Sequence, residues 1–339
     1  MINLGIIGYG SIGIRHKKEI ENNQHCNLVA ISDVKDNRLN LLDDPQIMKY
    51  VNYQDLLSIK KLDIVSICAP NYLHCQMTVD ALKAGKHVIC EKPMALNSTD
   101  CKKMVNTALK NDKKLFIVKQ NRYNPPVLAV KELIDSGKLG NIFSIVVNCY
   151  WNRNKAYYQE SAWKGKKTKD GGALYTQFSH FIDLMYWFCG DIKSIYSRAS
   201  NFNNPEIEIE DTGQVSLGFE NGVIGSINFT NCSYGKNMEG SIVLFAEYGT
   251  IKIGGQYLNE LEYQNIEGKD IRQLPRSKGP NDYGEYQGTM SNHHKVYENV
   301  VNTFKGVESI GVSGIEGMKT VEIIEGAYRS IENNTIVLL

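Results

Sequence analysis

The sequence predicts an α/β Rossmann domain with a doubly wound parallel sheet, followed by an α+β domain with a large, mainly antiparallel open sheet. Its 339 residues exceed what one domain of about 150 residues requires. Apolar runs alternate with helix-like stretches over the first 120 residues, which is typical of βαβ units. After Pro126, β-branched and aromatic runs follow one another through tight turns. We therefore expect domains at residues 1–121 and 122–339.

The predicted strands of the first domain are short apolar runs. They lie at residues 2–8, 28–33, 63–69, 87–90 and 115–118. Pro70 ends the third strand before its helix, and Gly85 follows a helix-like stretch in the manner of a C′ glycine.

The second domain carries a strong hairpin signal at Asn221-Gly222, between two strand-like runs. Further strand-like runs predict an antiparallel sheet and lie at residues 142–151, 192–199, 241–246 and 250–253. We expect a helix over about 173–188 and a terminal helix over about 314–331 to cover this sheet.

Composition excludes several classes of protein. Lys plus Arg number 38 and Asp plus Glu number 37, so no global positive field attracts nucleic acid or an anionic membrane. Eight cysteines without a C-x-x-C pair indicate reduced thiols. No secretory signal pattern and no apolar run of about 20 residues is present, which predicts a cytoplasmic protein.

A glycine-rich turn predicts dinucleotide binding. Gly8-Tyr9-Gly10-Ser11-Ile12-Gly13 follows a strand and opens a helix, where backbone N–H groups can meet a pyrophosphate. Asp33 ends the next strand, where its carboxylate can accept hydrogen bonds from ribose hydroxyls. That carboxylate repels a 2′-phosphate and favours NAD over NADP, although Lys35 and Arg38 lie nearby in the sequence. The turn residues predicted to contact the cofactor are Gly8, Gly10, Ser11, Ile12 and Gly13.

Two further stretches, residues 69–74 (APNYLH) and 84–93 (AGKHVICEKP), resemble the Gfo/Idh/MocA family of two-domain sugar and cyclitol oxidoreductases. The most specific element is Glu91-Lys92-Pro93 at a predicted strand end, where α/β sheets bind ligands. The resemblance implies that Lys92 contacts substrate and cofactor and that Lys92-Pro93 is a cis peptide; the alternative is a solvated lysine capping a loop. Further cofactor contacts that it implies are Ala69, Pro70, Asn71, His74, Glu91, Gln120 and Trp163.

A third motif runs from Gly171 to Asp183. Helical spacing places Thr176 one turn before His180, with Gln177 and Asp183 at i±3. A lone histidine on such a helix can be a satisfied core residue, whereas the resemblance implies that His180 is catalytic. Many family members carry Asp where Thr176 stands, so the sequence departs from an inositol-dehydrogenase-like proton relay.

Several residues resemble the nucleotide-sugar branch of the family, whose members oxidise C3 of UDP-N-acetylglucosaminuronate with bound NAD. They are Gln177 beside a non-acidic residue, Tyr157-Tyr158, Trp163-Lys164-Gly165 and the stretch 121–125. The predicted substrate-binding residues are Lys92, Asn121, Arg122, Tyr123, Lys164, Thr176, Gln177 and His180. Lys164 belongs to a basic cluster with Lys166, Lys167 and Lys169 that either attracts a diphosphate or uronate or is a solvated loop. The planar fork of Arg122 suits a carboxylate or phosphate.

The expected reaction is oxidation of a secondary sugar hydroxyl. His180 starts near a pKa of about 6.5 and Lys92 near about 10.4, so we assign His180 as base and Lys92 as the cation that stabilises the alkoxide, with swapped roles as the alternative. Rival functions are a dehydrogenase of a free sugar, an inositol or a sugar phosphate, and a non-catalytic NAD or sugar-nucleotide sensor. His293-His294 lacks a third ligand at recognisable spacing, so no metal is predicted. An exposed sheet face predicts a homodimer or homotetramer.

Overall fold

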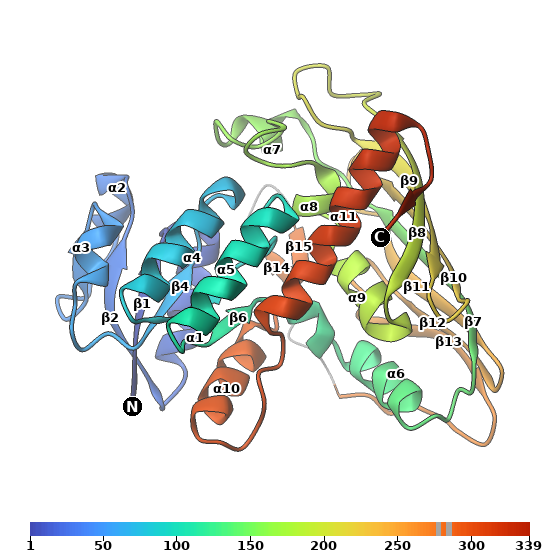
Figure 1. Cartoon of the computed structure of the whole chain (residues 1–339), viewed down its shortest axis with the longest axis horizontal. Coiled ribbons are helices and arrows are strands. Elements are labelled where there is room, and N and C mark those ends of the chain that lie inside the picture. Colours follow the sequence, from blue (N-terminus) through green and yellow to red (C-terminus); the bar gives the residue numbers. More distant parts are fainter. Residues whose placement is uncertain (276–278, 283–286) are drawn as a thin grey trace. The chain divides into compact units, whose positions relative to one another are not determined.

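The computed structural model describes residues 1–275, 279–282 and 287–339 (Figure 1). The chain forms two compact units. The first unit contains Met1–Lys119 together with His293–Val321, and the second contains Gln120–Asn292 together with Glu322–Leu339. The predicted division placed all residues after 121 in the second domain, so the structure differs for His293–Val321.

The first unit is built on a six-stranded parallel sheet with the order β3-β2-β1-β4-β5-β6. This order reverses between β1 and β4, which makes the sheet doubly wound, as predicted. Its strands are β1 (Ile2–Ile7), β2 (Cys26–Ser32), β3 (Met48–Tyr50), β4 (Ile64–Ile67), β5 (His87–Cys90) and β6 (Leu115–Ile117). The sequence analysis missed β3, because Met-Lys-Tyr at a sheet edge contains no apolar run.

Helices connect these parallel strands, and α4 and α5 lie side by side (Figure 1). The helical segments are α1 (Ser11–Glu21), α2 (Asp36–Leu39), α3 (Tyr53–Leu57), η1 (Asn71–Leu73), α4 (His74–Lys83) and α5 (Ser98–Lys110). After α4, Gly85 adopts φ +77°, and the Lys86 N–H donates to the Ala81 carbonyl. This is the C′ glycine that the sequence predicted.

Helix α10 (His293–Phe304) belongs to the first unit because it packs on α1. Tyr297 of α10 is fully buried, and its hydroxyl lies 2.7 Å from His16 Nδ1 and 2.9 Å from Ser66 Oγ. These contacts join residues more than 200 positions apart, and a local sequence pattern does not reveal such contacts.

His87 on β5 predicts a pH dependence of stability. Its Nδ1 accepts the Lys114 N–H at 2.9 Å, and burial together with Lys113 and Lys114 lowers its pKa from 6.5 to about 4. The unfolded chain therefore binds this proton first as pH falls, so the His87 contribution is present above pH 6.5 and is lost towards pH 4. In urea unfolding at pH 7 and pH 4.5, we expect His87→Asn to lose less stability on acidification than wild type. An equal loss in both proteins would contradict this assignment.

The second unit contains an eight-stranded sheet with the order β13-β12-β11-β7-β10-β9-β8-β16. Its neighbouring strands are antiparallel apart from β7 and β10, which confirms the predicted mainly antiparallel sheet. The strands are β7 (Ile142–Tyr150), β8 (Ile192–Ser200), β9 (Thr212–Phe219), β10 (Ile224–Thr230), β11 (Glu239–Ala246), β12 (Gly249–Gly254), β13 (Glu260–Ile266) and β16 (Val337–Leu338). Gly222, at φ +89°, forms the predicted hairpin between β9 and β10. A separate two-stranded sheet pairs β14 (Pro280–Asp282) with β15 (Gln287–Met290).

The predicted helix over about 173–188 is two helices in the structure, α8 (Ala173–Thr176) and α9 (Ser179–Cys189). Between them, Phe178 has φ −107° and ψ 2°, outside helical values. Its buried ring packs against the rings of Trp151 and Phe229, with centroids 5.5 and 5.3 Å away. No Gly or Pro marks this break, so the single-helix prediction was wrong.

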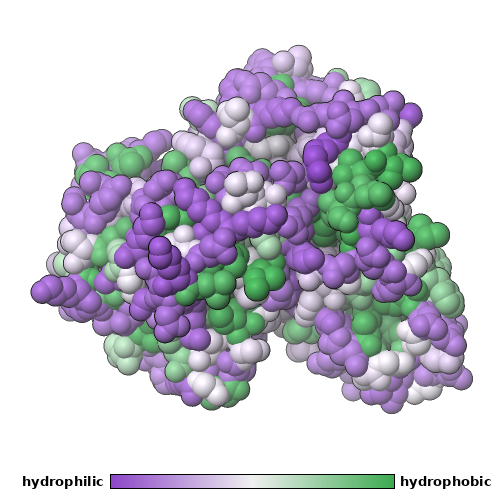
Figure 2. Space-filling model, viewed as in Figure 1, coloured by the Kyte–Doolittle hydropathy of each residue, from purple (hydrophilic) through white to green (hydrophobic). Residues whose placement is uncertain are grey.

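The remaining helical segments are η2 (Gln120–Tyr123), α6 (Pro125–Asp135), α7 (Lys155–Gln159) and α11 (Gly314–Asn333), which includes the predicted terminal helix. Helix α9 contacts β7, whose residues alternate in burial. Figure 2 shows apolar groups gathered near the C-terminus, where Ile336 and Leu338 are exposed. Among the described residues, no helix combines the length and apolarity needed to span a bilayer. All eight cysteines carry free thiols.

Candidate functional site

The glycine turn between β1 and α1 leaves no room for side chains. Gly8 adopts φ +95°, and a Cβ there would lie 2.6 Å from the Cys68 carbonyl oxygen. A Cβ on Gly13 would overlap the Gly8 carbonyl. The turn therefore brings bare backbone to the N-terminus of α1, where N–H groups can hold a pyrophosphate. Ser11 is exposed and Ile12 is half-buried at this end of the helix.

Asp33 lies directly after β2 and is tied to the same turn. Its Oδ2 accepts the Tyr9 N–H at 2.7 Å, and its Oδ1 accepts the Lys35 N–H at 2.9 Å. The Arg38 guanidinium lies 3.2 Å from Asp33 Oδ2 and 3.4 Å from a Cβ built on Gly10. The structure thus places the carboxylate beside the turn, as a ribose contact requires, with a cation next to it.

Two segments at the ends of β4 and β5 are joined by His74. The buried imidazole lies 2.8 Å from the Ala69 carbonyl oxygen and 2.7 Å from the Pro93 carbonyl oxygen. Burial lowers the pKa of His74, and the two carbonyls oppose that shift. Lys92-Pro93 is a cis peptide, as the resemblance implied. His74 therefore ties together the two stretches that carry the resemblance.

The Glu91 side chain is buried and engaged by the protein. Its Oε1 lies 3.0 Å from His16 Nε2 and 3.3 Å from His293 Nε2, and its Oε2 accepts the Lys92 N–H at 3.0 Å. Burial alone would raise the Glu91 pKa, but the two histidines outweigh it and hold the pKa well below the usual range. The three groups that meet here could hold a metal ion, with ligand atoms within 4.8 Å of one another. Sequence spacing gives no sign of these partners of His293, because His16 and Glu91 are distant from it in the sequence.

In the second unit, Thr176 contacts a carboxylate that the sequence analysis did not select. Its hydroxyl donates to the Asp170 carboxylate, which also accepts the Gly165 N–H at 2.7 Å. Asp170 is fully buried. At the position where the resemblance led us to expect Asp, a hydroxyl is thus bonded to an Asp six residues earlier. Asp170 directly precedes Gly171-Gly172, where the third motif begins, and this position in the sequence could have marked it as a candidate site residue.

Gln177 and Lys164, both predicted to bind substrate, meet at Tyr157. The Gln177 amide donates to the Tyr157 hydroxyl at 2.8 Å, and the Lys164 ammonium lies 3.9 Å from the centre of the Tyr157 ring. Arg153, another residue that the sequence analysis missed, lies 5.3 Å from that ring centre and is buried. This cluster combines buried cations with polar groups, which suits an anionic sugar.

The basic cluster near Lys164 is largely paired with glutamates. Lys164 pairs with Glu160, Lys166 with Glu208 at 3.0 Å and Lys167 with Glu332 at 2.7 Å. Burial lowers the pKa of Lys164, while Glu160 opposes that shift. These pairs favour the solvated-loop alternative for Lys166 and Lys167, whose side chains are about half-exposed or more.

Helix α9 carries His180 and Asp183, both buried. Asp183 forms a two-pronged ion pair with Arg122: Nε donates at 2.9 Å and Nη2 at 3.0 Å. The guanidinium also lies 4.9 Å from the centre of the Trp187 ring. The Arg122 guanidinium was predicted to bind substrate, but in the structure it is paired with the Asp183 carboxylate.

Four other predicted residues lie on two segments of the second unit. Gln120 and Asn121 of η2 are buried, and Gln120 donates to the Thr289 hydroxyl at 2.8 Å. Tyr123 and Trp163 are half-buried.

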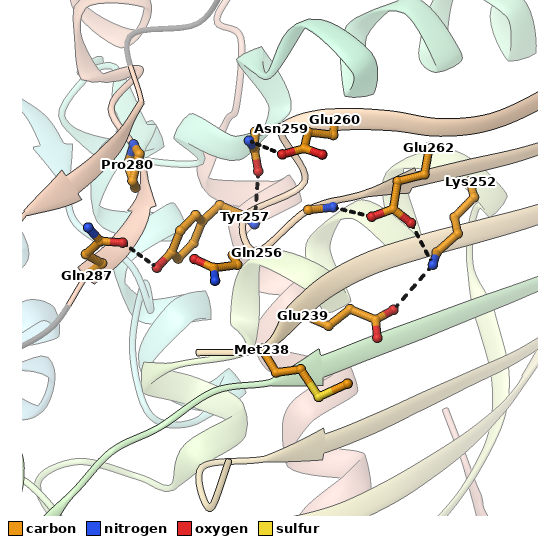
Figure 3. A pocket seen from close by; sticks show the side chains of 11 residues that line it. Met238, Glu239, Lys252, Gln256, Tyr257, Asn259, Glu260, Glu262, Pro280 and Gln287 are labelled. Atoms are coloured by element: carbon orange, nitrogen blue, oxygen red, sulfur yellow. Dashed lines mark hydrogen bonds and ion pairs between the residues drawn. The ribbon is translucent and has the colours of Figure 1, made fainter. Parts of the chain in front are cut away.

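A separate hollow of about 470 Å³ lies beside β11, β12 and β13 (Figure 3). Lys252 points between Glu239 and Glu262, at 3.8 and 2.7 Å. Glu260 also lines the hollow, so it carries more negative than positive groups. None of the site residues predicted from sequence lines it, and its charge does not suit an anionic sugar.

Comparisons with known proteins cover both parts of the chain. Residues 2–119 match the family model described as the oxidoreductase family with an NAD-binding Rossmann fold. Residues 127–252 match the GFO/IDH/MocA C-terminal domain. Inositol 2-dehydrogenase of Salmonella typhimurium is 28% identical over 248 residues, which cover 69% of each chain.

Two solved structures are similar over their full length. The WlbA dehydrogenase of Bordetella pertussis, solved with NADH and UDP-GlcNAcA, is 31% identical with a TM-score of 0.89, covering 100% of this chain and 98% of its own. The WlbA protein of Chromobacterium violaceum, solved with the same two ligands, is 30% identical with the same TM-score, covering 100% of this chain and 96% of its own. The family matches, with the glycine turn and Asp33 in place, show that this chain belongs to the Gfo/Idh/MocA family of NAD-dependent oxidoreductases.

Proposed function

We propose that the protein oxidises a secondary hydroxyl of a nucleotide-linked sugar, at C3 of a UDP-linked N-acetylated sugar or uronate. The observation that carries this proposal is the full-length similarity to the WlbA dehydrogenase solved with NADH and UDP-GlcNAcA. The buried cluster of Tyr157, Lys164 and Arg153 supports it, because an anionic substrate needs cations at the site.

We assign the chemistry to Lys92 and His180. Bound NAD supplies the hydride acceptor. His180 takes the hydroxyl proton, and the Lys92 ammonium stabilises the negative charge that develops on the oxygen. The carbon–hydrogen bond breaks with its electron pair as hydride, the hydroxyl becomes a carbonyl, and His180 gains one proton.

A substrate panel tests the proposal against its rivals. Purified protein is mixed with NAD and, separately, with UDP-GlcNAcA, UDP-GlcNAc, a free sugar, myo-inositol or a sugar phosphate, and absorbance is followed at 340 nm. We expect reduction of NAD with a UDP-sugar and a 3-keto product by NMR. Turnover of myo-inositol or a free sugar, with none of the UDP-sugars, would favour the alternative, a dehydrogenase of free sugars or inositols. The similarity to the Salmonella inositol 2-dehydrogenase supports that alternative. Binding of NADH without any turnover would favour a sensor.

Cofactor preference gives a further prediction, for which Asp33 is the residue to change. We propose NAD as the cofactor in preference to NADP, because the Asp33 carboxylate repels a 2′-phosphate. Asp33→Ser removes this repulsion and leaves Arg38 3.4 Å from the Gly10 position. We expect the ratio of kcat/KM for NADP to that for NAD to rise by about tenfold or more.

The double variant Asp33→Ser with Arg38→Ala is the matched control. It lacks the cation as well, so most of the gain for NADP should disappear. If the single variant left the ratio unchanged, Asp33 would not determine the preference.

We also propose a homodimer or homotetramer formed through the outer face of the second sheet. Ile224 and Phe245 are exposed on this face, and both pair in register with Ser144. Light scattering after size-exclusion chromatography measures the copy number.

A further inference from the structure

We propose that Glu91, held by His16 and His293, is a positioning residue that fixes the backbone of Lys92. This inference rests on the proposed function, in which Lys92 stabilises the alkoxide. It concerns contacts within the first unit, between buried side chains and the half-buried Lys92.

The contacts of Glu91 divide between its two oxygens. Oε2 accepts the N–H of Lys92 itself at 3.0 Å, so the carboxylate is bonded to the peptide that carries the lysine. Oε1 meets Nε2 of His16 at 3.0 Å and Nε2 of His293 at 3.3 Å. The carboxylate therefore cannot rotate without breaking at least one of these bonds.

The Glu91 carboxylate determines which ring nitrogens of the two histidines carry protons. An ionised carboxylate only accepts, so both histidines donate from Nε2. The other ring nitrogen of His16, Nδ1, lies 2.7 Å from the Tyr297 hydroxyl, and that hydroxyl lies 2.9 Å from Ser66 Oγ. Burial keeps the pKa of Tyr297 well above the usual range, so its proton stays available. These contacts join β4, α1, the residue after β5 and α10.

The same three groups could hold a metal ion, but their hydrogen bonds already account for them. Oε1 meets both Nε2 atoms at hydrogen-bond distance, and Oε2 is bonded to the Lys92 N–H. Two histidines and a glutamate can bind zinc with a water as the fourth ligand, and three such groups lie together here among the described residues. The hydrogen bonds among these side chains explain the cluster without an added ion or a further ligand, so we interpret it as a hydrogen-bonded clamp.

Fixing the backbone of Lys92 matters because its ammonium stabilises the alkoxide only when it lies next to the oxygen on which negative charge develops. A shift of about 1 Å in a reacting group can cost about 10²-fold in rate. Glu91 is adjacent to Lys92 in the chain, and its second anchor, α10, lies about 200 residues away. Folding of α10 onto α1 thereby completes the support for the lysine.

The experiment uses Glu91→Gln and His293→Gln in the full-length protein. We expect kcat with UDP-GlcNAcA to fall by about 10–10²-fold in both variants. The Kd for NADH, measured by fluorescence, should change little in His293→Gln, because His293 is not among the predicted cofactor contacts. Amide hydrogen exchange at Lys92 should become faster in both variants, a readout that needs no substrate. Tyr53→Phe is the control. It removes a hydroxyl that is bonded to Asp80 at 2.7 Å in the same unit, and it changes none of the hydrogen bonds around Glu91.

Each outcome decides the matter. If both folded variants retain wild-type kcat and Lys92 exchange, the clamp is refuted. If kcat falls only in proportion to lost folded protein, with Lys92 exchange unchanged, Glu91 is merely structural. Stoichiometric zinc in wild-type protein by mass spectrometry, lost in both variants, would replace the clamp with a metal site. If Lys92→Met retains full activity, the proposed function fails, whatever Glu91 does.

Discussion

Lys92→Met is expected to lower kcat for sugar oxidation by about 10²–10³-fold, the loss typical of removing one group that stabilises a developing oxyanion. Methionine keeps an apolar stem of similar length and removes the charge. The cation is needed when the hydroxyl loses its proton, and much less when the sugar binds, so KM should change little. Single-turnover absorbance at 340 nm measures the chemical step, and NADH fluorescence verifies that cofactor binding survives.

His180→Asn separates the two assigned roles. Removing the base should also slow hydride transfer, by about 10²-fold or more, and the loss should shrink at high pH, where hydroxide accepts the proton. If His180→Asn transferred hydride at the wild-type rate while Lys92→Met did not, the lysine would be the base and the assignment would be reversed.

The sequence predicts the first unit well because its signals are local. Buried parallel strands are continuous apolar runs, and glycines at 8 and 13 are required by close backbone contacts. The short strand β3 escapes this logic, since it pairs at the edge of the sheet with a lysine at its centre. The position of α10 also escapes it, because that helix is held by His16 and Ser66 from distant segments.

The candidate site is harder to predict because partners decide what a charged group does. Arg122 and Lys166 both look like anion ligands in the sequence, yet Asp183 and Glu208 neutralise them in the fold. Conversely, Asp170 becomes relevant only when the turn before α8 brings it to Thr176. The sequence shows which groups are available, and the pairs that form in the fold decide which of them are engaged.

The ion pair between Arg122 and Asp183 carries the largest expected effect on stability. The two side chains are 4% and 1% exposed, so removing the arginine leaves a buried carboxylate without this cation. We expect Arg122→Met to lower the free energy of unfolding by about 3–5 kcal/mol, measured by urea denaturation at pH 7.

The double variant Arg122→Met with Asp183→Leu distinguishes a structural ion pair from a substrate ligand. Apolar replacement of both partners removes the unpaired charge, so most of the lost stability should return. If Arg122 contributes only through Asp183, KM for UDP-GlcNAcA should return with stability. A double variant that is stable, yet binds the sugar far more weakly than wild type, would show that the guanidinium also contacts substrate. A single variant as stable as wild type would mean that the ion pair contributes no net stability.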